Sequence, residues 1–474
     1  MLPGVLRIRY TTGWVGVKSG GRGLPSLVIG VLDQVTVTTH CDEALMVSPE
    51  VEGMAPERRR GVQEGRLRGL VDRLLAAGGL QAARLRDCGV RSGLDVSLED
   101  IHRLPMVRKF DLWEHYPHGL RAVDAEEVVC VHGSSGTGGR PTLVPYTARD
   151  LEIWAEVMAR ALAAAGATAR SVVHNAYGYG LFTGGLGVHH GAIRLGATVV
   201  PLSGGMTERQ VALIRDLRPD VLTCTPSYAV HLGEACAAAG VEPTSLKVGV
   251  HGAEPWTAEL KGQIERLLGI RAYDIYGLSE IIGPGVACES ADSGGMLTIA
   301  EDHFYPECVD ADGNPVPDGT PGELVFTTLT KTGMPLLRYR TGDVATLADA
   351  VPGSPRTMRR MSKVLGRTDD MLIVRGVNVY PTEIEAVVLG DDRVGPHYLI
   401  IEDRRAARTE LRVAVEAVVE AAGLGDDLAH ALHERLGVGC DVRVLPPGSV
   451  PRTEAGKARR VVRWTEGPAP LPGF

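Results

Sequence analysis

VHGSSGTGGRPTLVPY, residues 131–146, is a loop rich in glycine and hydroxyl residues that lies between a short apolar run and a proline. Glycines let backbone N–H groups turn toward an anion, because no Cβ stands in the way. The hydroxyls add donors, and Arg140 adds a fixed positive charge with several N–H groups. Such a lining suits a di- or triphosphate, although the G-x-x-x-x-G-K-S/T spacing of a Walker loop is absent. The alternative is an ordinary Gly/Ser-rich surface loop.

The sequence after this loop predicts a helix and then a regular alternation of elements. Thr147 with Asp150 forms a capping pattern, and apolar residues follow at helical spacing from Leu151 to Leu162. We expect strands at 172–176, 197–202, 221–225, 246–250 and 272–275, and helices at 189–195, 208–217, 228–239 and 258–268. This alternation predicts an α/β fold with largely parallel, buried sheets.

Changes in composition divide the chain into three expected parts. Residues 1–45 are rich in Gly, Val and Thr without an amphipathic period, so we expect a non-native or disordered extension and a native start at Met46. Residues 46–368 are expected to form a large domain, which begins with an amphipathic helix at 56–77 and becomes β-rich at 323–328 and 336–340. Residues 369–474 are expected to form a small α+β domain. Its predicted strands are 372–374, 397–401, 411–415 and 442–445, and its helices are 381–388 and 427–436.

Composition excludes several classes of function. The chain has 474 residues, of which 44% are hydrophobic and 23% charged, as in globular proteins. Its net charge of −8 gives no attraction to nucleic acid or to an anionic membrane. The eight cysteines form no C-x-x-C pair and suit reduced thiols, so we expect a cytoplasmic protein.

Four later stretches supply acidic and basic groups. Tyr276–Glu280 follows a predicted parallel strand, whose carboxyl end is where α/β folds hold ligands, and Glu280 is a candidate Mg²⁺ ligand. Asp343 offers a carboxylate for the two hydroxyls of a ribose, residues 366–370 lie at the proposed domain boundary, and Lys457 lies in a Gly-containing loop. Each could be an ordinary turn carboxylate or an exposed lysine; their order along one chain is the stronger signal.

That order resembles the adenylate-forming superfamily of acyl-CoA synthetases, peptide-synthetase adenylation domains and luciferases, and within it the phenylacetate–CoA ligase family. The similarity extends over about residues 50–465. The most specific matching stretches are SSGTGGRPT (134–142), YGYGLFTGGLG (177–187), GAEPW (252–256), YGLSEIIGPGVACE (276–289), EDHFYPE (301–307), GELVFTTLTK (322–331) and GRTDDMLIVRGVNVYPTEIE (366–385).

The resemblance implies a nucleotide site that uses ATP with Mg²⁺ at Glu280. The implied phosphate loop consists of Ser134, Ser135, Gly136, Thr137, Gly138, Gly139 and Arg140. The other implied nucleotide residues are Gly252, Ala253, Glu254 and Tyr276 around adenine, Gly277 and Ser279 near the phosphates, and Asp343 and Arg367 at the ribose. Lys457 would bridge the substrate carboxylate and the α-phosphate, where negative charge develops during formation of the acyl-AMP.

The resemblance also implies a second step and an acyl pocket. The small domain would rotate about a hinge at Asp369, and the segment Gly376, Val377 and Asn378 would then line a tunnel for the thiol of coenzyme A. The implied pocket residues are Tyr177, Tyr179, Phe182, Gly184, Ile281 and Pro284, together with Gly252 and Ala253. Aromatic rings beside glycines leave a flat slot that suits an aryl ring such as that of phenylacetate; the alternative is plain core packing.

Two rival functions remain open at this stage. The acceptor could be the phosphopantetheine of a carrier protein in natural-product biosynthesis instead of coenzyme A. Alternatively, the chain could bind nucleotide without catalysis, although the presence of Glu280, Asp343, Arg367 and Lys457 together argues against this. The resemblance also suggests a homodimer.

A structural zinc site is a separate hypothesis. His251, Cys288, Glu289, His303 and Cys308 are of ligand type and follow one another in sequence, but their spacings fit no standard zinc finger. The alternative is that they are buried histidines and free thiols.

Overall fold

The computed structural model describes residues 7–10, 13–16, 45–134, 141–368, 370–406, 408–419, 422–452 and 457–471. The chain divides into two compact units, residues 1–42 and 43–474. In the first unit the described residues form two short antiparallel strands, β1 (Arg7–Tyr10) and β2 (Gly13–Gly16). Most of residues 1–45 lie outside the described residues, so the non-native or disordered extension stays a prediction.

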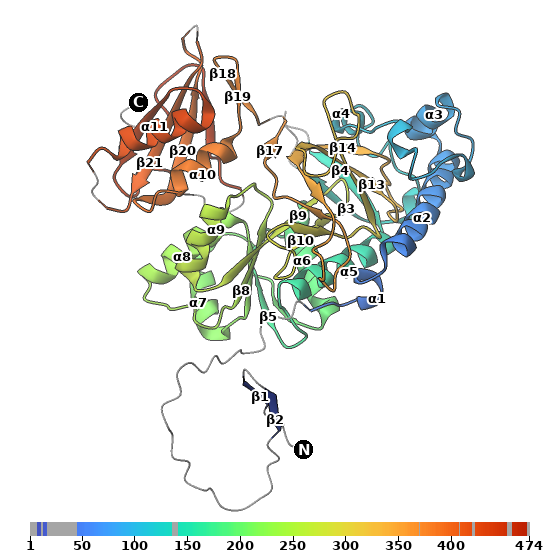
Figure 1. Cartoon of the computed structure of the whole chain (residues 1–474), viewed down its shortest axis with the longest axis horizontal. Coiled ribbons are helices and arrows are strands. Elements are labelled where there is room, and N and C mark those ends of the chain that lie inside the picture. The colour runs from blue at the N-terminus through green and yellow to red at the C-terminus, as the bar shows by residue number, and fades with distance from the viewer. Residues whose placement is uncertain are drawn as a thin grey trace, which may run out of the picture. The chain divides into compact units, whose positions relative to one another are not determined.

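A nine-stranded sheet forms the centre of the second unit (Figure 1), in the order β15-β16-β11-β10-β9-β8-β7-β5-β6. Its parallel half contains β5 (Val172–Asn175), β6 (Thr198–Val200), β7 (Val221–Cys224), β8 (Val248–Gly252) and β9 (Arg271–Leu278). Its antiparallel half contains β10 (Gly283–Glu289), β11 (Leu297–Ile299), β15 (Leu347–Ala348) and β16 (Arg360–Met361). The inner parallel strands are nearly continuously buried because both faces of the sheet are covered.

Helices on the two faces enclose separate hydrophobic cores. Val221 on β7 packs into the core beneath α5 (Ala148–Ala164) and α6 (Thr183–Leu195). The next residue, Leu222, points to the opposite core, beneath α7 (Thr207–Leu217), α8 (Pro226–Ala238) and α9 (Ala258–Leu268). Figure 1 shows α7, α8 and α9 side by side. The predicted cap of α5 is confirmed, since the Thr147 side chain accepts from the Asp150 N–H and the Asp150 carboxylate accepts from the Thr147 N–H.

Smaller elements complete the large domain. They are α1 (Pro49–Glu52), α2 (Pro56–Ala77), α3 (Gly79–Asp87), α4 (Lys109–Glu114), the 3₁₀ turns η1 (Gly93–Asp95), η2 (Ile101–Arg103) and η3 (Ala125–Glu127), and the antiparallel pair β3 (Val128–Ser134) and β4 (Thr142–Thr147). A four-stranded antiparallel sheet consists of β12 (Phe304–Val309), β13 (Gly322–Thr328), β14 (Tyr339–Ala345) and β17 (Gly366–Arg367). The β-rich stretch expected around 336–340 overlaps β14 at residues 339 and 340, whereas residues 336–338 precede the strand.

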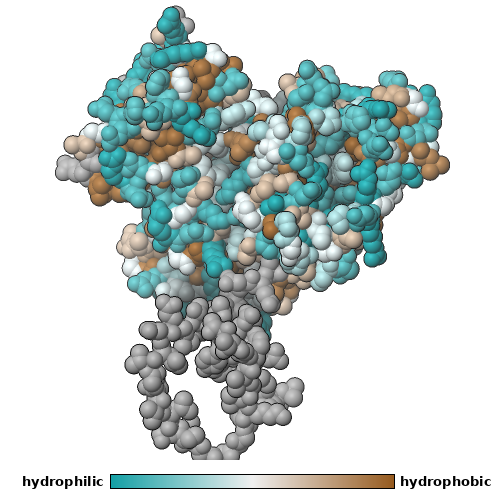
Figure 2. All heavy atoms as spheres, viewed as in Figure 1, coloured by the Kyte–Doolittle hydropathy of each residue, from teal (hydrophilic) through white to brown (hydrophobic). Residues whose placement is uncertain are grey.

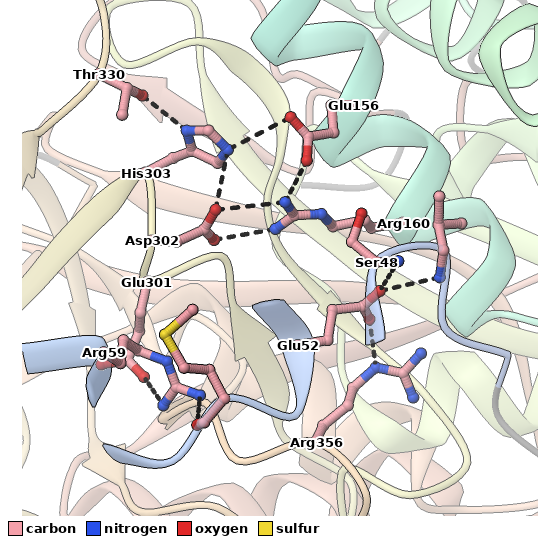
Figure 3. Close-up of polar contacts among 12 residues, drawn as sticks. Ser48, Glu52, Arg59, Glu156, Arg160, Glu301, Asp302, His303, Thr330 and Arg356 are labelled. Atoms are coloured by element: carbon pink, nitrogen blue, oxygen red, sulfur yellow. Dashed lines mark hydrogen bonds and ion pairs between the residues drawn. The ribbon is translucent and has the colours of Figure 1, made fainter. Parts of the chain in front are cut away.

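A buried charge network ties α1 and α2 to the body of the large domain (Figure 3). Glu52 pairs with Arg356 at 3.0 Å, and Arg59 pairs with Glu301 at 3.3 Å. On the other side of the network, Arg160 of α5 reaches Asp302 at 2.9 Å. All of these side chains are nearly fully buried, so each charge depends on its partner.

The C-terminal segment begins with the hairpin β18 (Leu372–Val374) and β19 (Val377–Val379). It continues into a four-stranded sheet in the order β22-β21-β20-β23. The members of that sheet are β20 (Val394–Asp403), β21 (Glu410–Ala417), β22 (Cys440–Leu445) and β23 (Val461–Trp464), and its helices are α10 (Pro381–Leu389) and α11 (Leu424–Leu436). Both predicted helices are present; β23, which pairs in parallel with β20, was not predicted.

The face drawn in Figure 2 is mostly hydrophilic, with apolar side chains scattered over it in small groups. Among the described residues, no helix has both the length and the apolar character needed to cross a membrane.

Candidate active site

Glu280 lies in a four-residue turn that joins the last parallel strand, β9, to the antiparallel strand β10. Its carboxylate is fully buried, and its Oε1 accepts a 2.8 Å hydrogen bond from the Ser134 hydroxyl at the end of β3. The Lys109 ammonium, on α4, lies 3.7 Å from the same oxygen. The start of the phosphate loop and the predicted metal ligand are therefore neighbours, although they are 146 residues apart in sequence.

The surroundings of the second carboxylate oxygen of Glu280 suit a bound Mg²⁺ ion. Oε2 is buried and has no hydrogen-bond partner within the part of the chain that the structure describes. A buried, unpaired carboxylate oxygen is costly on its own, and it is the ligand type that Mg²⁺ takes from proteins beside phosphate oxygens. The chemistry of the Glu280 side chain thus fits a divalent cation.

Lys331 lies beneath this turn and was not identified from the sequence as a site residue. Its side chain is 2% exposed, and its ammonium donates a 2.9 Å hydrogen bond to the carbonyl oxygen of Glu280. The ammonium also lies 4.8 Å from the ring centroid of Tyr146. Burial lowers the pKa of Lys331 to about 8, while the negative charges of Asp150 and Glu280 act in the opposite direction.

Three of the predicted nucleotide residues form a chain of hydrogen bonds. The Tyr276 hydroxyl donates to Asp343 Oδ2 at 2.7 Å, and Arg367 Nη1 donates a short bond to Asp343 Oδ1. Asp343 and Arg367 face each other across the β14–β17 ladder, which fixes their separation. Burial, reinforced by the Asp343 charge, raises the pKa of Tyr276 well above 10, so its hydroxyl remains a donor.

The predicted adenine residues end the neighbouring strand, β8. Gly252 pairs with Ile275, and a Cβ on Gly252 would lie 2.1 Å from the Ile275 carbonyl oxygen. Ala253 follows with φ +72°, a conformation that non-glycine residues rarely adopt. These backbone features place residues 252–254 beside Tyr276 at the carboxyl edge of the sheet.

Glu254 connects this edge to the C-terminal segment. Its Oε1 accepts from the Ser227 N–H at 2.7 Å, and its Oε2 accepts from the Ala458 N–H at 2.8 Å. Burial raises the pKa of Glu254, while the Arg460 charge and these hydrogen bonds oppose the rise. The contact places the residue after Lys457 against the predicted nucleotide site.

Lys457 itself is exposed to solvent, with charged groups of the predicted site around it. Desolvation by the surrounding protein, together with the positive charges of Arg367 and Lys109, lowers the pKa of Lys457; Glu254 and Asp343 oppose the shift. The charges that act on Lys457 belong to residues from the phosphate, ribose and adenine parts of the predicted site. The structure therefore brings together Glu280, Asp343, Arg367, Glu254 and Lys457, and adds Lys109.

The residues predicted to form the acyl pocket differ in how deeply they are buried. Tyr177 is 7% exposed and its ring packs over Gly184, where an added Cβ would lie 3.2 Å from the ring. The Tyr179 hydroxyl accepts from the Asn175 amide at 2.7 Å. Ile281 is fully buried in the core, whereas Phe182 is 57% exposed and so does not belong to an enclosed pocket in this structure. Pro284 is partly buried, and its carbonyl accepts from the Trp154 indole N–H at 3.1 Å.

Several predictions fall where the structure gives limited information. Residues 135–140 of the phosphate loop and Asp369, the predicted hinge, lie outside the described residues. The predicted tunnel residues form the β18–β19 hairpin, with Gly376 at φ +82° and both Gly376 and Asn378 exposed to solvent. They do not line a tunnel in this conformation.

The zinc hypothesis is wrong for the arrangement seen here, because the candidate ligands lie in separate places. Cys288 donates to the Ala161 carbonyl, Cys308 donates to the Ala345 carbonyl, and His303 Nδ1 lies 2.7 Å from the Thr330 hydroxyl. His251 Nδ1 lies 3.1 Å from the Cys224 carbonyl oxygen, while Glu289 pairs with Lys261 at 2.6 Å. Across the described ranges, no group of three or more His, Cys, Asp or Glu residues is arranged to hold a metal.

Comparisons of sequence agree with this geometry. Residues 73–330 match the AMP-binding enzyme family, and residues 376–463 match the AMP-binding enzyme C-terminal domain. The chain is 50% identical over 445 residues to a phenylacetate-coenzyme A ligase of Thermus thermophilus, covering 88% of this chain and 99% of that protein. It is 49% identical over 376 residues to a phenylacetate-coenzyme A ligase of Escherichia coli, covering 77% and 85% of the two chains.

Comparison of structures points to one conformational state. A 2-hydroxyisobutyryl-CoA ligase in the postadenylation state, with its acyl-AMP bound, superposes with TM-score 0.82 at 29% identity over 88% of this chain and 91% of that one. In complex with acyl-AMP and CoA in the thioesterification state, that enzyme superposes with TM-score 0.66 at 30% identity, covering 88% and 92%. The position of the C-terminal segment, with Ala458 on Glu254, thus resembles the postadenylation state more than the thioesterification state. The chain belongs to the AMP-binding, adenylate-forming enzymes, with a large AMP-binding domain and a separate C-terminal domain.

Proposed function

We propose that this protein is an ATP-dependent ligase that converts an aromatic carboxylic acid, with phenylacetate as the first candidate, to its coenzyme A thioester. The single observation that carries the proposal is that Asp343, Arg367, Glu254 and Lys109 lie close enough to Lys457 for their charges to act on it, while Lys109 also lies 3.7 Å from Glu280. Relatives that are named phenylacetate-coenzyme A ligase and are about half identical to this chain supply the substrate class.

In the first half-reaction a carboxylate oxygen of the acid attacks the α-phosphorus of ATP. The bond from that phosphorus to the bridging oxygen breaks, and the products are acyl-AMP and pyrophosphate. The Lys457 ammonium would hold the attacking carboxylate beside the α-phosphate and offset the negative charge that develops there. The carboxylate of Asp343, oriented by Tyr276 and Arg367, would accept hydrogen bonds from the ribose hydroxyls.

The phosphates would lie between the loop that begins at Ser134 and the turn that carries Glu280. Glu280 would be the protein ligand of Mg²⁺, which when bound neutralises phosphate charge and favours departure of pyrophosphate. Lys109 would add a second positive charge on the same side, since its ammonium already faces Glu280. The backbone N–H groups of the glycine-rich loop would provide the remaining donors.

The acyl group would lie against Tyr177, whose side chain is almost fully buried. The absence of a side chain at Gly184 lets the Tyr177 ring pack closely over the backbone there. Rings with adjacent glycines favour an aryl acid over a branched aliphatic acid.

In the second half-reaction the thiolate of coenzyme A attacks the acyl carbon, and AMP leaves. The Ala458–Glu254 contact would have to break for the C-terminal domain to rotate about Asp369 and bring Gly376, Val377 and Asn378 to the active site.

Substitution of Lys457 by alanine tests the proposal. We expect Lys457→Ala to lose acid-dependent pyrophosphate release while still forming thioester from supplied phenylacetyl-AMP and coenzyme A. Arg459→Ala is the matched control, because Arg459 is an exposed neighbour in the same segment. Adenylation at the wild-type rate in Lys457→Ala would contradict the proposed role. Acyl-AMP that accumulates and does not react with coenzyme A would instead identify a carrier-protein thiol as the acceptor.

A further inference from the structure

Buried side chains hold the turn that carries Glu280 by its backbone carbonyls. Lys331 donates to the Glu280 carbonyl at 2.9 Å. The Tyr146 hydroxyl lies within hydrogen-bonding distance of the Ser279 carbonyl at 3.0 Å and of the Ile282 carbonyl at 3.2 Å. Three of the four carbonyls of the turn 279–282 therefore meet a buried side-chain donor. Such contacts fix a turn more firmly than its backbone alone would.

Other buried groups in turn hold Lys331 and Tyr146 in place. Asp150, which is fully buried, accepts from the Thr332 N–H at 2.7 Å and from the Gly333 N–H at 2.8 Å, which fixes the two residues after Lys331. The ring of Tyr146 lies against the Lys331 ammonium at 4.8 Å and is fully buried. Lys331 and Tyr146 therefore act as one rigid support beneath the turn.

These backbone contacts matter because only one of the two carboxylate oxygens of Glu280 has a partner among the described residues. Ser134 and Lys109 contact Oε1, whereas Oε2 has no partner among the described residues. The direction in which Oε2 points is consequently set by the backbone of the turn, and that backbone rests on Lys331. A small rotation of the peptide at residue 280 would move Oε2 away from the phosphates.

We propose that Lys331, together with Tyr146, is a positioning residue for adenylation that sets the orientation of the Glu280 carboxylate through the Glu280 carbonyl. The inference rests on the proposed function, since it concerns the first half-reaction of that scheme. Lys331 touches neither substrate nor metal in it. Its loss should therefore weaken metal-dependent adenylation and leave thioester formation from a preformed adenylate unchanged.

The test compares Lys331→Met with two controls. Methionine keeps an unbranched side chain but removes the charge and the donor, whereas Lys331→Arg keeps both and should recover part of the activity. Lys261→Met is the matched control elsewhere, because Lys261, like Lys331, has an oxygen partner (here the Glu289 carboxylate) and lies near an aromatic ring centroid, 5.6 Å from that of Tyr273. Each variant is assayed for acid-dependent pyrophosphate release across a Mg²⁺ titration, for thioester formation from supplied phenylacetyl-AMP, and for thermal unfolding.

For Lys331→Met we expect adenylation to fall by on the order of 100-fold and the Mg²⁺ concentration for half-maximal rate to rise by about fivefold, as for loss of a preorganised group. Thioester formation from supplied adenylate should stay within about threefold of wild type, and Lys261→Met should leave both steps within about threefold. An equal loss in both half-reactions, or unchanged adenylation and Mg²⁺ dependence, would overturn the inference.

If Lys331→Met does not fold, Tyr146→Phe tests the same support, because it removes only the hydroxyl and keeps the ring beside Lys331. We expect a loss of adenylation of about tenfold with the thioester step intact; equal losses in the two steps would overturn the inference. Failure of the wild-type protein to form any acyl-AMP would defeat the proposed function itself, and so is distinguishable from failure of this inference.

Discussion

Replacing Glu156 with glutamine removes one charge from the buried network in Figure 3 and has an effect that can be worked out from the structure. Glu156 lies on α5, one turn before Arg160, and receives a short hydrogen bond from Arg160 Nη2; His303 Nε2 lies 3.7 Å from its other oxygen. His303, Arg160 and their hydrogen bonds lower the pKa of Glu156 from 4.5 to about 2.

The sign of the effect follows from this depressed pKa. The Glu156 charge stabilises the fold at pH values above 4.5, and the contribution disappears as the pH falls from 4.5 toward 2. The pKa shift from 4.5 to about 2 corresponds to a contribution of about 3 kcal/mol to the free energy of unfolding, since one pKa unit equals about 1.4 kcal/mol. Because the Glu156 side chain is 23% exposed, screening by solvent reduces the expected contribution to about 2 kcal/mol.

Urea unfolding of Glu156→Gln and wild type at pH 7 and pH 3 measures the difference in free energy of unfolding. We expect the variant to be less stable by about 2 kcal/mol at pH 7 and by under about 1 kcal/mol at pH 3. Glu152→Gln is the control on the same helix, because Glu152 pairs with Arg149 where both side chains are 63% exposed; its effect should be below about 0.5 kcal/mol. A Glu156→Gln effect equal to that of the control, or one that does not shrink on acidification, would refute the reasoning.

Three further predictions concern the site. Gly277→Ala should lower the melting temperature and abolish pyrophosphate release, because its Cβ would lie 1.8 Å from the Gly283 carbonyl oxygen; wild-type values in both assays would contradict the described turn. Tyr276→Phe removes the 2.7 Å hydrogen bond to Asp343 and should raise KM for ATP by about tenfold with little change in kcat, whereas an unchanged KM would show that Asp343 needs no such partner. Chelation of Mg²⁺ should stop adenylation yet spare thioester formation from supplied phenylacetyl-AMP; inhibition of both steps alike would count against a role for the metal at Glu280 alone.

Local signals in the sequence predicted much of the large domain. The bounds of α2 and α9 agree with the prediction because apolar residues recur at helical spacing in both, and the Thr147–Asp150 cap marks the start of α5. Strand β23 was not predicted, since its pairing partner, β20, lies far earlier in sequence. The β-rich stretch expected around 336–340 was placed too early, because Leu336 and Leu337 are buried in hydrophobic clusters from the segment just before β14.

In the candidate site, residues that lie in recognisable motifs were predicted, whereas residues that act through distant parts of the chain were not. Asp343 and Arg367 could be named from their motifs, and a ladder between two strands brings them together. Lys109 and Lys331 were missed because each acts through residues more than 50 positions away, Glu280 above all. The zinc hypothesis failed for the converse reason: neighbours in sequence order, such as Cys288 and His303, face different partners in the fold.

The most direct test of the central claim is a product balance. The purified protein is incubated with ATP, Mg²⁺, coenzyme A and phenylacetate or related aryl acids, and all products are quantified by mass spectrometry. The account predicts acyl-CoA, AMP and pyrophosphate in equal amounts from at least one aryl acid, with acyl-AMP in place of the thioester when coenzyme A is omitted. Cleavage of ATP to ADP, or consumption of ATP without any acyl-AMP or acyl-CoA across the acids, would contradict it.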